Sequence, residues 1–223
     1  MRAMAENSKQ GSIRGSAAFG ATSKATAVTP CFTPGTGIAT GKGEVAVEAL
    51  RVGDGVVTRD NGIQKIRWIG ARRFHGRELT ANRHLTPILI RAGALGGGLP
   101  ERDMRLSPNH RVLVSSDQTA LYFEEREVLV AAKHLVNHRG VFEVESLGVT
   151  YIHFLFDAHE VVLADGSWSE SFQPADHTLR GIGNAQRREI SEIFPELSAG
   201  QGSERFRPAR RILSRNEARL LKD

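Results

Sequence analysis

The chain has 223 residues, a single cysteine and a formal net charge of +5 at neutral pH. This length allows one well-packed domain with appendages, or two small domains at most. A lone cysteine excludes an intramolecular disulfide framework and a cysteine-rich structural zinc site. Because arginine and glutamate are interleaved along most of the sequence, the net charge indicates a solvated mixed-charge surface and argues against nucleic-acid binding.

The composition also bounds the fold class. Aromatic residues make up only 6% of the chain, so a core must rest mainly on Val, Ile and Leu. The 23 glycines and several short β-branched runs are typical of turns and strands. We therefore expect an all-β architecture.

Residues 1–28 are rich in Ser, Ala, Gly, Thr and Lys and show no sustained periodicity, which predicts a flexible segment. They lead into Thr29, Pro30 and Cys31. Because the Pro30 carbonyl is bonded to the Cys31 nitrogen, the thiol can attack it through a five-membered ring and replace the peptide bond by a thioester. A well-placed intramolecular nucleophile has an effective concentration of about 10⁵ to 10⁸ M. A lone cysteine is more often a small buried hydrophobe, but the Thr and Pro flanks here favour a reactive one.

Short strands and turns are expected after this cysteine. The alternation around Val45 and Val47 predicts a half-buried strand, after a reversal at residues 41–43. Asp60-Asn61-Gly62 predicts a hairpin turn before a strand over residues 66–69. Asp54 lies among turn residues, and we expect it to cap a turn rather than to act as a catalytic carboxylate.

The middle of the chain continues the β pattern. Residues 86–92 predict a strand, and residues 94–100 form a Gly-rich loop without the Lys-Ser/Thr ending of a phosphate-binding loop. His75 and His84 form no metal-binding pattern, so we expect surface histidines and no metal site. Residues 141–156 are the longest strand-like region, with a bulge or turn expected at Gly148.

The composition changes after Pro174. Ile190, Ile193 and Phe194 have helical spacing and are followed by Pro195, which predicts a helix over residues 186–194. Residues 205–222 mix arginines with a few large apolar residues. They are either an amphipathic helical appendage packed on the domain or a basic arm for an acidic partner or nucleic acid.

Four motifs together resemble the Hint family, the self-processing domain shared by hedgehog C-terminal regions and inteins. They are CFTPGT from Cys31, RAGALGGGLPERD from Arg91, LSPNHRVLV from Leu106 and HEVVLADGSWSESF from His159. Within the first block, the resemblance rests also on Gly43, Glu48, Leu50, Gly53-Asp54 and Val56. The combination is closest to the bacterial Hint-type domains. It implies an all-β Hint fold, a pseudo-twofold β-hairpin horseshoe, here with a C-terminal helical appendage.

The resemblance also implies roles for individual residues. Ser107 and His110 fall on the Thr-x-x-His motif of the family, with Ser in place of Thr. His110 would protonate the Cys31 nitrogen as it leaves, and Ser107 would polarise the Pro30–Cys31 amide or hold the imidazole. The catalytic Asp of intein relatives is replaced in this chain by Ile152 or His153. His153 is the candidate substitute, Asp157 a less favoured one, and His159 is expected to make local hydrogen bonds.

The expected function is single-turnover self-cleavage in cis. Cys31 takes the Pro30 acyl group, and the N-terminal segment is then released to water or transferred to a small external nucleophile. Full splicing is not expected, because residues 169–172 lack the terminal His-Asn pair of inteins. The alternative is a non-catalytic Hint-fold scaffold whose basic tail binds an acidic partner. Neither reading requires a cofactor.

Three segments follow from these assignments: a flexible, extein-like segment over residues 1–29, a Hint domain over residues 30–172 and a helical tail over residues 173–223. No stretch is apolar and long enough to span a membrane, and the N-terminus lacks the apolar core of a secretory signal. A C-terminal export signal would escape this scan, so cytoplasmic and exported locations both stay open.

Overall fold

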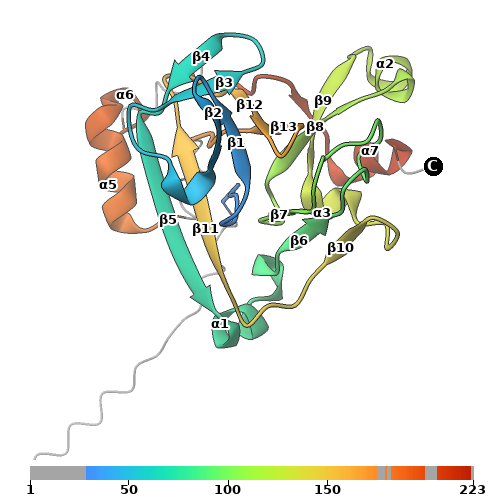
Figure 1. The fold of residues 1–223 in the computed structure, drawn as a ribbon, viewed down its shortest axis with the longest axis horizontal. Helices are drawn as coiled ribbons and strands as arrows, with labels where there is room; N and C mark the ends of the chain where they lie inside the picture. The colour runs from blue at the N-terminus through green and yellow to red at the C-terminus, as the bar shows by residue number, and fades with distance from the viewer. Residues whose placement is uncertain (1–28, 175–178, 180–181, 199–204, 222–223) are drawn as a thin grey trace, which may run out of the picture.

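A computed structural model describes residues 29–174, 179, 182–198 and 205–221. The flexible segment expected over residues 1–28 therefore lies outside the described residues. The described chain is mostly β, with short helices between the strands and near the C-terminus (Figure 1).

Two hairpins follow the cysteine. Strands β1 (Gly37–Thr40) and β2 (Gly43–Ala46) are joined by a tight turn in which Gly43 has a φ of +106°, a value that suits glycine. A short 3₁₀ turn, η1 (Val47–Ala49), leads to the second hairpin, β3 (Gly55–Thr58) and β4 (Gly62–Lys65). Asp54 accepts a hydrogen bond from the Arg51 amide at 2.7 Å and so closes the turn between the hairpins.

These hairpins belong to a nine-stranded sheet with the order β14-β9-β8-β13-β12-β1-β3-β4 and β2 on β1. Its other strands are β8 (Arg111–Ser115), β9 (Glu127–Ala131), β12 (Val161–Ala164), β13 (Ser167–Glu170) and β14 (Arg211–Ile212). The pairing of β14 with β9 is parallel, whereas its neighbours pair antiparallel. The sheet thus joins both ends of the described chain.

Two smaller sheets complete the strands. One has the order β10-β6-β7, from Val141–Glu143, Ile88–Ile90 and Met104–Leu106. The other pairs the long strands β5 (Trp68–His75) and β11 (Gly148–Leu155) over eight residues each. The expected strand over residues 141–156 is therefore two strands, and β11 begins at Gly148.

Phe32 connects the two smaller sheets. It forms isolated bridges with Leu106 of β7 and with Ile152 of β11. Its amide donates to the Ile152 carbonyl at 2.8 Å, and the Ile152 amide donates back at 2.9 Å. The neighbouring Cys31 is thereby held between β7 and β11.

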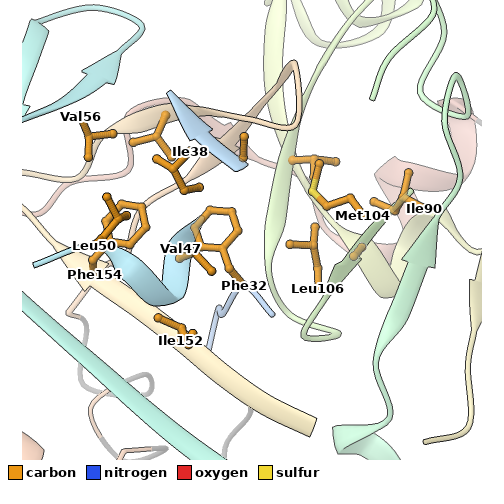
Figure 2. Packing of buried hydrophobic residues seen from close by; sticks show 14 of the residues in the cluster. Phe32, Ile38, Val47, Leu50, Val56, Ile90, Met104, Leu106, Ile152 and Phe154 are labelled. Atoms are coloured by element: carbon orange, nitrogen blue, oxygen red, sulfur yellow. The ribbon is translucent and has the colours of Figure 1, made fainter. Parts of the chain in front are cut away.

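The Phe32 ring is also central to the main core. It is 1% exposed and lies parallel to the Phe154 ring, with the ring centroids 5.5 Å apart. Figure 2 shows it among aliphatic side chains that include Ile38, Val47 and Leu106. Because consecutive residues of an extended segment point to opposite sides, Cys31 faces a different cluster.

Helices fill the connections. They are α1 (Gly76–Ala81), η2 (Arg83–Leu85), α2 (Asp117–Phe123), α3 (Ala132–Leu135), α5 (Asn184–Ile193), α6 (Pro195–Ser198), α7 (Arg215–Ala218) and η3 (Arg219–Leu221). The helix expected over residues 186–194 is α5, which lies beside β5 in Figure 1. None of the helices in the described ranges is long and apolar enough to cross a bilayer.

The last described segment, residues 205–221, is only partly helical. It adds β14 to the edge of β9 before α7 and η3, and Leu213 is 2% exposed. Its arginines bind carboxylates of this chain: Arg210 contacts Asp60 at 2.7 Å and Glu127 at 2.8 Å. The expectation of a helical appendage therefore missed a strand, because a two-residue parallel pairing leaves no period in the sequence.

A second apolar cluster binds the C-terminal helices to the β domain. It contains Trp68, Leu155, Phe172, Ile182, Ile190, Phe194 and Phe206. Phe194 is 1% exposed and meets Phe206 edge to face, with the ring centroids 5.3 Å apart. The C-terminal segment thus shares a core with strands β5 and β11.

Phe194→Ala is expected to lower the free energy of unfolding by about 3–5 kcal/mol, the range for a buried Phe replaced by Ala. Denaturant titration measures this change. Leu147→Ala is the matched control, because Leu147 is 98% exposed and its truncation should change stability by less than about 0.5 kcal/mol. A Phe194→Ala effect no larger than that of the control would contradict the shared core.

Candidate functional site

Cys31 is buried at the junction of the two smaller sheets. Its side chain is 3% exposed and packs in a cluster from β5, α1, η2 and β11. The other buried members of this cluster are Phe74, Leu79, Leu85 and Tyr151. The thiol therefore has an apolar surrounding on this side.

Ser107 holds the main chain on both sides of Pro30. Its hydroxyl donates to the Thr29 carbonyl at 2.8 Å and accepts from the Cys31 amide at 2.8 Å. Its own amide donates to the Cys31 carbonyl at 3.0 Å. Ser107 is fully buried and directly follows β7. It therefore fixes the position of the Pro30–Cys31 peptide bond, at which the sequence predicts cleavage.

His153 contacts the sulfur. Its Nδ1 lies 3.1 Å from Cys31 Sγ, and the thiol also lies 3.2 Å from the Thr29 carbonyl oxygen. His153 is on β11 one residue after Ile152, whose backbone pairs with Phe32, so the strand register brings the imidazole to Cys31.

Two aromatic rings, which also contact each other, pack on the His153 imidazole. The rings of Trp68 and Phe172 are both stacked on it, each with a centroid distance of 5.1 Å. Trp68 reaches it by lying over Gly70, where a Cβ atom would come within 2.3 Å of the indole. Glu189 of α5 accepts a hydrogen bond from the indole Nε1 at 2.9 Å. The C-terminal helix thus helps to hold the imidazole in place.

Burial keeps the side chains of Cys31 and His153 neutral. Burial raises the pKa of the Cys31 thiol well above its ordinary value; the Ser107 hydrogen bond opposes this effect, and the Glu170 charge adds to it. Burial also lowers the pKa of His153 to about 3. At neutral pH the pair is therefore a thiol beside an uncharged imidazole, which can accept the thiol proton at Nδ1.

The His110 ring contacts Phe32 and Ser169. Its ring meets the Phe32 ring edge to face at a centroid distance of 4.4 Å, and its Nε2 lies 2.6 Å from Ser169 Oγ. Its amide donates to the Ser107 carbonyl, while its Nδ1 is buried without a hydrogen-bond partner. Burial lowers the pKa of His110 to about 4. Within the described residues, no hydrogen bond joins this ring to Pro30 or Cys31.

The two remaining candidates lie elsewhere. Asp157 is about half exposed and binds Arg67 and Arg205, each at 3.0 Å. His159 is buried, and its Nδ1 accepts a hydrogen bond from the Ala209 amide at 3.0 Å. Both side chains therefore anchor the C-terminal segment and do not approach Cys31.

Sequence reasoning missed the stacking of Trp68 and Phe172 on His153, and it missed Glu170. Phe172 and Glu170 lie in the motif HEVVLADGSWSESF, but their contact partners are distant in the chain. Gly70 next to Trp68 was the one local signal of a close approach. In the part of the chain that the structure describes, no three His, Cys, Asp or Glu side chains form a group that could hold a metal ion.

A surface hollow of about 1230 Å³ adjoins the cluster around Cys31. Leu79 lines the hollow and is also a member of this cluster. The lining of the hollow includes the charged residues Arg77, Arg83, Glu143 and Glu145. Leu79 is 5% exposed and forms part of the wall between the hollow and the buried thiol.

The fold and the site define a mostly β domain built around one buried cysteine and its preceding peptide bond. The chain belongs to the Hint domain family, whose profile matches residues 30–176. Among solved structures, a bacterial intein-like domain from Clostridium thermocellum is similar, with 16% identity, coverage of 63% of this chain and 97% of that chain, and a TM-score of 0.40. A DnaB intein from Synechocystis sp. PCC 6803 is also similar, with 10% identity, coverage of 64% and 99%, and a TM-score of 0.42. No functionally curated protein gives a significant match.

His153→Phe is expected to weaken the acid sensitivity of the fold. A pKa of about 3 in the folded state lies below the ordinary value of 6.5, so the unfolded state binds more protons as pH falls from 6.5. Stability is therefore lost with falling pH, by about 2 kcal/mol from this residue between pH 7 and pH 5. Denaturant titrations at both pH values should show this difference shrink in His153→Phe. His138→Asn, at an exposed histidine, should leave it unchanged; an unchanged difference in His153→Phe would contradict the buried neutral imidazole.

Leu79→Ala is expected to expose the thiol to reagents from the hollow. Labelling of Cys31 by a disulfide reagent should become at least about tenfold faster, because the wall between solvent and sulfur is thinned. Leu147→Ala, which changes an exposed residue of the same hollow, is the control and should label at the wild-type rate. Equal labelling of all three proteins would show that reagents reach Cys31 by another route.

Proposed function

We propose that this Hint domain cleaves its own chain before Cys31 through an N-to-S acyl shift. The observation that carries the proposal is the double contact at one residue: Ser107 Oγ lies 2.8 Å from the Cys31 nitrogen, and His153 Nδ1 lies 3.1 Å from the Cys31 sulfur. A basic group at the nucleophile and a hydroxyl at the leaving atom are what acyl transfer from an amide requires.

The steps balance in atoms and protons. His153 Nδ1 takes the thiol proton as the sulfur adds to the Pro30 carbonyl carbon. The carbon–nitrogen bond then breaks, and the Cys31 nitrogen gains a proton through the Ser107 hydroxyl, which must first release the Thr29 carbonyl. Protonated His110, whose backbone amide donates to the Ser107 carbonyl, is the proposed source of that proton. The positive charge thereby passes from His110 to His153. The proton lost by sulfur thus equals the one gained by the new amine, and the product is a thioester.

The thioester is then resolved by water or a small external nucleophile, which releases or transfers the segment that precedes Cys31. The hollow beside Leu79 supports access from outside the domain. Full splicing is not part of the proposal, since the chain lacks the His-Asn ending over residues 169–172.

The buried neutral pair argues for a slow or conditional reaction. Forming a thiolate and an imidazolium inside an apolar cluster costs several kcal/mol more than in water. The proline ring at residue 30 also crowds the approach to its carbonyl. Self-cleavage should therefore depend on strong external thiols or on partial opening of the site.

The alternative is a non-catalytic scaffold with a basic tail for an acidic partner. The structure supports this alternative less than self-cleavage, because the tail arginines already bind carboxylates of this chain. They are Arg205, Arg210 and Arg211. An unreactive Cys31 in the experiment below would favour it.

Incubation of the full chain with a strong thiol is expected to yield fragments 1–30 and 31–223, detected by intact-mass spectrometry. Cys31→Ala should abolish both fragments, because no acyl acceptor remains. Ser107→Ala should slow their appearance at least about 100-fold, since the leaving nitrogen loses its hydroxyl.

Ser115→Ala is the matched control, because this exposed serine ends strand β8 far from any role in the proposal. It should cleave at the wild-type rate. Identical masses for the wild type and Cys31→Ala throughout the incubation would refute the acyl shift.

A further inference from the structure

Glu170 is a fully buried carboxylate that the steps above do not use. It is 0% exposed, at the last position of β13. The Arg111 amide donates to its Oε1 at 2.8 Å, and the Arg111 guanidinium donates to its Oε2 at 2.7 Å. His159 Nε2 lies 3.4 Å from the same Oε2.

The two hydrogen bonds from Arg111 favour the ionised carboxylate. Burying a charge costs several kcal/mol unless hydrogen bonds and an opposite charge compensate it. Burial raises the pKa of Glu170, but Arg111 and His159 outweigh this effect and hold the pKa below its ordinary value. A permanent negative charge therefore lies inside the domain at neutral pH.

That charge is coupled to His110. Ser169, the residue before Glu170, lies with its hydroxyl 2.6 Å from His110 Nε2 and so fixes the orientation of the ring. Of the charged groups that act on His110, Glu170 favours its protonated form, whereas Arg111 and His159 oppose it. Glu170 is thus the group that offsets the cost of a cationic His110 in this dry environment.

We propose that Glu170 is a positioning residue for the acyl shift: its buried carboxylate stabilises the protonated His110 that supplies the proton for the Cys31 nitrogen. The proposal rests on the function proposed above and adds the residue that makes His110 an available acid. It also explains why a charge is buried at a position where an apolar side chain would avoid the cost of desolvation.

The C-terminal segment supports this arrangement. The Ala209 amide donates to His159 Nδ1, and His159 Nε2 lies 3.4 Å from Glu170 Oε2. Gln173 makes a second contact with the C-terminal segment, since its side-chain amide donates to the Phe206 carbonyl at 2.8 Å. Residues 205–211 thereby help to hold the groups that surround the carboxylate.

The first arm of the test measures the protonation of His110 directly. In the full chain carrying Cys31→Ala, the His110 ring protons are followed by NMR over the pH range in which circular dichroism shows an intact fold. Glu170→Gln, which keeps the shape and removes the charge, should lower the protonated fraction of His110 at every acidic pH. Glu160→Gln, at another buried glutamate held by Asn61, should leave it unchanged.

The second arm measures cleavage by an external thiol. Glu170→Gln should slow it about tenfold or more at pH 7, with the alkaline limb of the pH–rate profile, which reports loss of the proton from His110, moved to lower pH. Glu160→Gln should stay within about twofold of the wild type. Glu170→Asp, which retains a retracted charge, should fall between the wild type and Glu170→Gln in both arms.

A role limited to stability would lower the melting temperature of Glu170→Gln without changing the titration of His110, and that result would overturn the proposal. If Glu170→Gln does not fold, Glu170→Asp decides: His110 protonation equal to that of the wild type overturns it. The titration arm does not depend on cleavage. If the wild-type chain never cleaves, the proposed function fails, while the coupling between Glu170 and His110 is still decided by NMR.

Discussion

The pair of main-chain hydrogen bonds between Phe32 and Ile152 is the constraint on which the site depends. It holds an isolated segment between two small sheets and orients two neighbouring side chains in opposite directions. Phe32 enters the main core, while Cys31 meets Ser107 on one side and His153 on the other. Moving the pairing by one residue would exchange the two side chains and place a thiol in the hydrophobic core.

Burial positions the side chains of the site and also lowers their reactivity. The apolar cluster and the stacked rings define where sulfur and imidazole lie, but the same lack of solvent keeps each group uncharged. Local order and reactivity are therefore opposed in this domain. Motions that admit a few water molecules near Leu79 would lower the cost of separating charge. The rate of the proposed self-cleavage would then depend on the local opening of α1 and η2 as well as on the chemistry.

The sequence could predict the features that local patterns encode. The hairpins follow from glycine and alternation, and the family motifs identify Cys31, Ser107 and His110 as a group. His153 could be offered only as a substitute, because its proximity to sulfur depends on the register of β11 against Phe32. Three features depend on contacts between residues far apart in the chain: the packing of Trp68 and Phe172 on His153, strand β14 and the environment of Glu170. No local sequence pattern predicts them.

The stacking of two rings on His153 limits how this residue can handle a proton. The centroids of the indole and phenyl rings are themselves 6.1 Å apart, so the two rings pack on the imidazole from neighbouring directions and not from opposite faces. The Nε2 atom of His153 is buried without a hydrogen-bond partner within the described residues. A proton received at Nδ1 therefore has no hydrogen-bonded route to solvent through Nε2 within the described residues. In the proposed acyl shift, this proton would return to the sulfur or stay on the imidazole until Phe172 or Trp68 moves. The packing of these two rings would then decide how long the thioester can revert to the amide.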